Sequence, residues 1–453
     1  MASLYKYISS LRSPKKEIEL SPIFKLDVIC FAEIFDRLSL DELHKFGQTC
    51  KKSQQIAGDY FQCTYKSTEI RCATDGLNAY SYIFCSVQLN GFNRYIQKLS
   101  IYGNRNENEN DINVFDCMRS NCVDSLRHIQ FVDVAMTKKS VNSIRKLLKK
   151  VNILEIDTCT MDGKLYQHLL KCCKQLKRLS VRRFGGNIKW LTKHYPALEH
   201  LELYQIGFKI DHLKVFFERN QSVHSFAVDA NCLWQNEQSI MDANFELDDL
   251  IVDINGWEFH IESICKLLNR FFEKRFYRRL YLYAPYIDEE STAEIASVHG
   301  LEKLFLTSHI AYGIALPIFA NLKQMSFRSC PEFIEIESFA EKLASLERVH
   351  FGQATFSDVL LFIGRLVTLN TIKVDHFKNA HDFNHTLDLK TMNEQRKALC
   401  DASKIIVYVE ETIYLNTKWI TMPEMTNELS QIEIQRNDSC EWSHHFEYNR
   451  RTF

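Results

Sequence analysis

A six-residue pattern of apolar residues recurs along this chain of 453 residues and constrains its fold more than any other feature. Apolar residues stand at positions one, four and six, as in LERVHF from Leu346 to Phe351. Successive copies begin between 21 and 33 residues apart, which predicts an array of stacked units rather than one compact core. The fourteen copies begin at Ile96, Leu126, Val151, Leu176, Leu198, Val223, Leu247, Tyr277, Leu301, Leu322, Leu346, Leu369, Ala402 and Leu429.

The spacing within each copy predicts a β-strand. Positions four and six are two residues apart, so both lie on one side of a strand and form a core, while positions three, five and seven face the other side. About fifteen residues follow each strand, enough for a turn and a returning helix. Apolar residues at steps of three and four predict such helices in HLKVFFERN, IESICKLLNRFF and FSDVLLFIGRL.

Composition limits the class of protein. Apolar residues make up 45% of the chain and charged residues 25%, which is typical of a folded protein. The 15 cysteines are odd in number and follow a polar, basic start rather than a signal peptide, so we expect reduced thiols in the cytoplasm or nucleus. The longest mostly apolar stretch, near residues 311–320, is too short for a membrane-spanning helix, and we expect no membrane partner.

Charge is unevenly distributed along the chain. The formal net charge of −1 argues against a general nucleic-acid binder. However, residues 138–193 hold 15 Lys and Arg against three acidic residues. We interpret this excess as the solvated faces of helices, and a docking patch is the alternative.

The repeat resembles that of the leucine-rich-repeat family, in its longer, cysteine-containing type, over residues 90–440. The ninth position of that family is commonly Asn or Cys. It is kept at Asn104, Cys159, Asn231, Asn255 and Cys330. It is lost at Phe184, Ile206, Pro285, Ala354 and Phe377. The resemblance therefore implies a curved ladder of strands joined by irregular loops.

A different module precedes the repeats, between Leu26 and Lys52. Its apolar residues recur at helical steps, and Ser39 and Asp41 are placed to begin a second helix before Leu43. The residues alone predict helix, break and helix, which is compatible with any small helical bundle.

The order and spacing of these residues resemble an F-box, the short helical module that binds the adaptor of cullin-RING ubiquitin ligases. Leu26-Asp27 corresponds to the family's Leu-Pro, and Cys50-Lys51 to its Cys-Lys. Two residues differ from the family, since Asp27 replaces proline and Ser53 stands where tryptophan is common. The resemblance implies that the adaptor-binding residues are Leu26, Ile34, Phe35, Leu38, Leu43, Phe46 and Cys50.

Together the two resemblances imply an α/β chain, with a small helical F-box before a leucine-rich-repeat solenoid that has a curved parallel β-sheet and outer helices. We expect a flexible segment at 1–22, the F-box at 23–60, a helical connector or repeat cap at 61–92, about fourteen repeats at 93–440 and a tail at 441–453.

The implied function is that of a substrate receptor, which binds the adaptor and cullin scaffold of an SCF-type ligase and presents a target protein. A repeat-based scaffold outside any ligase is the main alternative, because Asp27 and Ser53 depart from the F-box pattern. Phosphate-binding loops, nucleophile elbows and zinc-binding motifs do not occur in the sequence, so we expect no enzyme activity, cofactor or metal.

The face formed by positions three, five and seven is the expected target-binding surface. Its earlier copies carry acids, namely Glu155, Asp157, Glu202, Asp229, Asp249 and Asp253. The later copies carry basic and aromatic residues, namely Arg279, Tyr281, Tyr283, Lys303, Phe305, Arg328, Arg348, His350 and Lys373. Arg and Tyr often dominate interface energies, and Arg suits carboxylates and phosphates. We therefore predict that the later stripe binds an acidic or phosphorylated segment, with scattered surface charge as the alternative.

Overall fold

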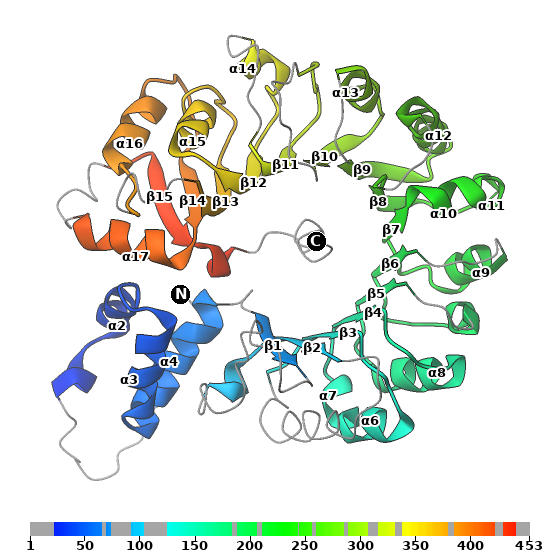
Figure 1. Ribbon diagram of the computed structural model, residues 1–453, viewed down its shortest axis with the longest axis horizontal. Coiled ribbons are helices and arrows are strands. Elements are labelled where there is room, and N and C mark those ends of the chain that lie inside the picture. Colours follow the sequence, from blue (N-terminus) through cyan, green and yellow to red (C-terminus); the bar gives the residue numbers. More distant parts are fainter. Residues whose placement is uncertain are drawn as a thin grey trace.

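The repeats form one parallel sheet that curves into a nearly complete ring. In the computed structural model, the strands follow one another in chain order from β1 to β15, each paired with the next. Figure 1 shows the strands lining the inside of the ring and the helices covering its outside. This is the architecture of a leucine-rich-repeat solenoid, as the sequence predicted. The structure describes residues 22–65, 69–73, 92–103, 125–183, 188–205, 211–242, 244–255, 260–284, 289–306, 316–330, 338–378, 385–421 and 429–440.

The strands are β1 (Glu69–Ala73), β2 (Lys98–Tyr102), β3 (His128–Val132), β4 (Ile153–Asp157), β5 (Arg178–Arg182), β6 (His200–Tyr204), β7 (Ser225–Asp229), β8 (Leu247–Asp253), β9 (Tyr277–Ala284), β10 (Leu301–Leu306), β11 (Gln324–Ser329), β12 (Arg348–Ala354), β13 (Thr371–Phe377), β14 (Ile405–Val409) and β15 (Ile432–Arg436). Strands β2 to β15 each fall on one copy of the pattern.

The α-helices are α2 (Val28–Phe35), α3 (Leu40–Gln48), α4 (Lys51–Thr64), α6 (Lys138–Ser143), α7 (Arg145–Leu148), α8 (Gly163–Cys172), α9 (Asp211–Arg219), α10 (Ala230–Gln235), α11 (Glu237–Met241), α12 (Ile261–Glu273), α13 (Glu289–Ala296), α14 (Phe339–Lys342), α15 (Phe356–Ile363), α16 (Leu389–Lys397) and α17 (Glu411–Ile420). Short 3-10 helices are η2 (Pro22–Lys25), η3 (Asn93–Tyr95), η4 (Ile188–Thr192) and η6 (Asn437–Ser439). Helices α9, α12 and α15 occupy the three segments predicted as helical returns.

Burial separates the two faces of the sheet as the pattern requires. In β8, Leu250 and Val252, at positions four and six, belong to the large apolar core between strands and outer helices. Ile251, at position five between them, belongs to a second apolar cluster on the inner face of the ring. The alternation of core and inner residues is therefore confirmed on this strand.

The register of the sheet follows the repeat except at two places. Strand β4 pairs Ile153 with Arg178 of β5, which are the same positions of consecutive copies. Between β9 and β10, Leu282 pairs with Leu304 after a bulge, and between β13 and β14, Ile372 pairs with Val407. Both pairings shift the pattern by two residues, which keeps every side chain on its own face.

The sheet begins earlier than the sequence predicted. Strand β1 pairs in parallel with β2 and places Ile70 beside Leu99 and Cys72 beside Ile101. This strand lies in the segment predicted as a helical connector or cap, and it adds one strand to the fourteen expected. The pattern missed it because Ser67 stands at the first position, where other copies have an apolar residue.

Four consecutive loops turn alike after their strands. Asp133, Thr158, Arg183 and Gln205 occupy position eight of the copies on β3 to β6, and all have φ between 47° and 56°. A left-handed residue lets the chain leave the sheet sharply. The four loops therefore begin with the same backbone conformation, whereas the varied residues at the ninth position predicted irregular loops.

Arg396 of α16 is fully buried. Its guanidinium donates to the carbonyl oxygens of Ser403, Ile363, Leu366, Val367 and Leu369 at 2.6 to 3.2 Å. Burial lowers the pKa of Arg396 to about 10. The side chain thus satisfies carbonyl groups mainly in the segment that joins α15 to β13.

None of the described helices is both long and apolar enough to cross a membrane. Cysteines within the described ranges are free thiols, and Cys172, Cys173, Cys232, Cys265 and Cys440 are buried.

Candidate protein-binding site

The three helices of the N-terminal module pack around aromatic side chains. Phe35 of α2 lies with its ring centroid 5.2 Å from that of Phe46 on α3 and 5.2 Å from that of Tyr60 on α4. Phe35 is 1% exposed, and Leu43 of α3 is fully buried. These residues hold the module together from within.

Each helix of the module begins at a side-chain cap. The carboxylate of Asp27 accepts from Cys30 N at 2.8 Å, so Asp27 starts α2 where the F-box family has proline. Ser39 and Glu42 form a capping box on α3. Cys50 caps α4, and its hydrogen bonds with Ser53 lower the pKa of the thiol. The substitution of proline by Asp27 therefore keeps a helix start by a different mechanism.

The other departure from the F-box pattern is also accommodated. Ser53 is 2% exposed, and its hydroxyl lies 2.9 Å from Thr49 Oγ1 and 3.2 Å from Cys50 Sγ. A tryptophan would not fit at this position without moving α4 away from α3. At this position the chain has a close polar contact, whereas the F-box pattern has a large apolar side chain.

The predicted adaptor-binding residues divide into two groups. Leu26, Ile34 and Cys50 are exposed, and Leu38 and Phe46 are partly buried. Phe35 and Leu43 lie inside the module, so the prediction of direct adaptor contact rests on the other five residues. Their role in this structure is to pack α2 and α3 together.

Helix α2 presents apolar side chains outward as well as inward. Its inner side carries Phe31 and Phe35, whereas Ile29 is 59% exposed and Ile34 is 39% exposed. Just before the helix, Ile23 and Leu26 are 38% and 39% exposed. A group of large apolar side chains that stays in solvent after folding is the usual mark of an interaction site.

The module is docked against the first repeats by very close packing. Gly58 of α4 faces the ring of Tyr95, and any Cβ atom at this position would overlap that ring. A Cβ atom at Gly47 would lie 2.7 Å from Phe92. Phe92 also contacts His44 and Phe61, with ring centroids 5.3 and 5.4 Å apart.

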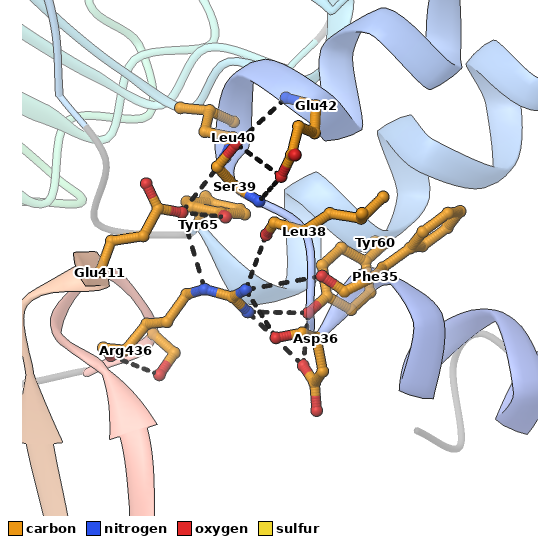
Figure 2. Close-up of polar contacts among 11 residues, drawn as sticks. Phe35, Asp36, Leu38, Ser39, Leu40, Glu42, Tyr60, Tyr65, Glu411 and Arg436 are labelled. Carbon is orange, nitrogen blue, oxygen red and sulfur yellow. Dashed lines mark hydrogen bonds and ion pairs between the residues drawn. The ribbon is translucent and has the colours of Figure 1, made fainter. Parts of the chain in front are cut away.

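The module also contacts the last repeat, about 400 residues away in the sequence. In Figure 2, the guanidinium of Arg436 on β15 points into the break between α2 and α3. It donates to the carbonyl oxygens of Asp36 and Leu38, both at 2.9 Å, and to the hydroxyl of Tyr60 at 3.0 Å. Burial alone would lower the pKa of Arg436, but Tyr65, Tyr60, Tyr414 and Asp36 raise it above its ordinary value.

Glu411 of α17 completes this contact, which we call the seam. Its carboxylate accepts from the hydroxyl of Tyr65 at 2.8 Å and from Leu40 N at 3.2 Å, as Figure 2 shows. The seam closes the ring, because α2 to α4 lie between β1 at one end and β15 at the other (Figure 1).

Sequence reasoning missed the seam, although one signal was present. Where the strand of a copy carries an apolar residue at position eight, as Ala284 does in β9 and Val409 does in β14, that residue is buried in the core. Arg436 occupies the same position in the last copy. A charged residue in a core position requires a nearby polar partner.

The inner face of the earlier repeats is a paired polar network, not an acidic surface. Glu155 lies 2.8 Å from His128 Nε2 and accepts from Gln130 at 3.0 Å. Glu202 contacts Arg178 and lies 3.3 Å from Arg182. The sequence prediction of an acidic half is therefore wrong, because it omitted the cations at positions three and seven of the neighbouring copies.

The remaining acids of that half are also held by neighbours. Asp157 pairs with Arg183 at 3.0 Å, and Asp249 pairs with Arg279 at 2.7 Å. Asp229 caps α10 through Cys232 N, and Asp253 accepts from Asn255 N at 2.9 Å.

An aromatic cluster occupies the middle of the inner face. Tyr281, Tyr283 and Phe305 are 6%, 3% and 7% exposed and pack with Tyr204 and Cys440. Lys303 lies 3.9 Å from the centre of the Tyr281 ring, and burial lowers its pKa to about 8. These side chains form a second small core on the inside of the ring.

The predicted target-binding residues are therefore not all available. Arg279 and Arg348 are exposed, and Lys303 and Arg328 are partly buried. Tyr281, Tyr283, Phe305, His350 and Lys373 are buried, and His350 lies 2.6 Å from Asp375. Of the predicted stripe, Arg279 and Arg348 are therefore the arginines that a partner can reach, and Arg279 already donates to Asp249 through Nε.

Most cations of residues 138–193 lie in solvent on the outer helices, whereas Arg178 and Arg182 take part in the inner network. Across the described part of the chain, no three His, Cys, Asp or Glu side chains are grouped so that they could hold a metal ion.

No protein-family model matches the chain, and no curated protein is significantly similar to it. Among solved structures, the chain is similar to one in the crystal structure of the Rad7 and Elc1 complex in yeast. That match has 10% sequence identity and a TM-score of 0.36, and it covers 96% of each chain.

Proposed function

We propose that this chain is the substrate-recognition subunit of an SCF-type ubiquitin ligase. The observation that carries the proposal is the outward apolar side of α2, in a module whose residues resemble an F-box. Ile29 and Ile34 remain exposed although the module is already packed against both ends of the solenoid. A helix that is apolar on both sides has a second partner still to bind.

In this role the chain makes and breaks no bonds. It would hold the adaptor and cullin scaffold through the module and a target protein through the ring. Catalysis would come from raised local concentration, because a held target lysine meets the ubiquitin carrier without a free encounter. The seam supports this role, since a module fixed at both ends places the target at a defined distance and orientation from the ligase.

The target-binding part of the proposal rests on two of the residues that the sequence predicted. Arg279 and Arg348 are the exposed members of the predicted stripe, and their fork-shaped donors suit carboxylate or phosphate groups. Arg279 already pairs with Asp249, so an acidic target would have to compete with that carboxylate.

The decisive experiment is co-expression with the F-box-binding adaptor and the cullin, followed by affinity capture. Ile34→Asp should abolish recovery of the adaptor, because it places a charge in an apolar contact. Ile318→Asp is the matched control, since Ile318 is 68% exposed on the β10 to β11 side of the ring. Phe35 is unsuitable as a test, because its loss would unfold the module.

Recovery of the adaptor by wild type and by Ile318→Asp, but not by Ile34→Asp, supports the ligase role. If wild-type protein never recovers the adaptor, the ligase role is wrong and the chain is better described as a repeat-based scaffold. For the target, Arg279→Glu with Arg348→Glu should reduce capture of acidic targets while adaptor recovery stays unchanged.

A further inference from the structure

Exposed apolar side chains are concentrated at one place on the ring. Among the described residues, four large ones belong to the start of the module, and two belong to the end of α17. The first group is Ile23, Leu26, Ile29 and Ile34, and the second is Trp419 and Ile420, which are 62% and 58% exposed. Trp234, Ile318 and Val367 are single exposed residues on other repeats. Single exposed apolar residues are common on protein surfaces, whereas groups of them indicate an interaction site.

The seam places Trp419 of the second group next to the end of α2. Arg37, just after α2, donates to the carbonyl oxygen of Lys418 at 3.1 Å. Its guanidinium lies 5.5 Å from the centre of the Trp419 ring. In Figure 1, the start of the module and α17 are neighbours across the point where the ring closes.

Helical spacing makes the surface continuous. Ile29, Glu33 and Arg37 follow one another at steps of four residues, so they lie along one side of α2 and its end. This row of side chains begins at the exposed Ile29 and ends at Arg37, whose guanidinium lies over the ring of Trp419. A groove of about 680 Å³ runs between the two elements and is lined by Glu33, Arg37 and Lys418, among others.

The arrangement has the composition of a protein interface. Apolar anchors at both ends are separated by a polar groove with charged residues of both signs. Tryptophan and arginine are the side chains that most often dominate binding energy. Trp419 stays mostly in solvent although Arg37 covers part of it, so another surface can still bury it.

We propose that the adaptor-binding surface continues from α2 across the seam onto α17, with Trp419 and Ile420 as a second anchor. This inference rests on the proposed function, because its occupant is the same adaptor. We choose the adaptor as the occupant because the two surfaces are continuous. A protein that covers Ile29 and Ile34 on α2 would reach Arg37 and Trp419 one helical turn further along. Adaptor binding would then depend on a closed ring.

The test measures the affinity of the purified full chain for the purified F-box-binding adaptor by calorimetry. Trp419→Ser and Ile420→Ser should each weaken binding about tenfold or more, as expected for loss of an interface anchor. Trp234→Ser and Ile318→Ser are matched controls of the same chemistry elsewhere on the ring, and they should bind like wild type.

Ile420→Ser separates direct contact from loosening of the seam, because Ile420 lines a pocket with Phe356 and Leu389, whereas Arg37 contacts Lys418 and Trp419. Hydrogen exchange gives a second readout, in which bound adaptor should slow exchange of amides within 411–421. Unchanged thermal unfolding of each free variant shows that its fold is intact.

The possible results are distinguishable. If wild type binds the adaptor but Trp419→Ser and Ile420→Ser bind equally well, this inference is wrong and the proposed function stands. If wild type does not bind the adaptor, both are wrong. If the wild type is a dimer and the variants are monomers, the surface binds a second copy of the chain and the inference is wrong. If removal of residues 1–21 makes Trp419 more accessible to fluorescence quenchers, the surface binds the chain's own N-terminal segment and the inference is also wrong.

Discussion

Two kinds of boundary hold this molecule together, and they differ in chemistry. Neighbouring repeats meet through buried apolar side chains and the backbone ladder, as Leu250 and Val252 do on β8. At the seam, the module meets the last repeat largely through Arg436 and Glu411. Apolar boundaries tolerate shifts, and the sheet shifts by two residues at β9 to β10 and at β13 to β14. The hydrogen bonds of Arg436 join one side chain to particular carbonyl oxygens of the module, so the seam fixes where the last repeat meets it.

The largest expected effect comes from breaking the seam. Arg436→Ala leaves the carbonyl oxygens of Asp36 and Leu38 without their donor and should destabilise the closed ring by about 4 kcal/mol. Urea unfolding gives the change in stability, and hydrogen exchange locates it. Exchange should accelerate in β15 and α2 to α4 but not in β7 to β9. Faster exchange across all repeats would mean that the seam supports the whole sheet.

A change in an apolar boundary should have a somewhat smaller effect and a different location. Leu250→Ala removes a fully buried side chain and should cost about 3 kcal/mol. Because repeats contact mainly their neighbours, the loss of protection should centre on β7 to β9 and spare the seam. Equal acceleration at the seam would show that the two boundaries are not independent. Leu250→Met, which nearly conserves volume, is the control.

Within the seam, a single hydrogen bond should contribute less. Tyr65→Phe removes the hydroxyl that donates to Glu411 at 2.8 Å and should cost about 1 kcal/mol. Combining it with Glu411→Gln tests coupling, because contacting residues give non-additive changes. If the two changes in the free energy of unfolding are strictly additive, Tyr65 and Glu411 are not energetically coupled.

The smallest effect concerns the inner polar network and its response to acid. Burial alone would raise the pKa of Glu155, but His128, Arg178 and Lys98 lower it below its ordinary 4.5. A lowered pKa adds stability above pH 4.5, and this stability is lost as the pH falls below that value. Glu155→Gln should therefore flatten the loss of stability between about pH 5 and pH 3. An unchanged acid profile would contradict this pairing.

Local pattern was enough to predict the strands, their two faces and several of the helices. The period located fourteen strands, and the alternation around Leu250 matched the observed burial. Strand β1 was missed because an apolar first position is absent there. The register shifts were missed because a shift of two residues leaves the pattern of faces unchanged.

The site was predicted less well, because it depends on contacts between distant segments. Phe35 and Leu43 match the F-box pattern, but the pattern does not distinguish residues of the module core from residues of its surface. Burial of Tyr281 and His350 follows from the curvature of the ring and from neighbours on adjacent strands, which no single repeat reveals. Trp419 lies outside both motifs and becomes relevant only because Arg37 reaches it.

The position of Arg436 also has a consequence for how the protein is made. A ribosome produces the module first and this arginine about 400 residues later, so the helices emerge long before their final partner exists. Until synthesis has passed β15, the carbonyl groups between α2 and α3 lack their arginine donor and the ring is open. A chain interrupted in any repeat therefore carries its module without the contact that marks a finished molecule.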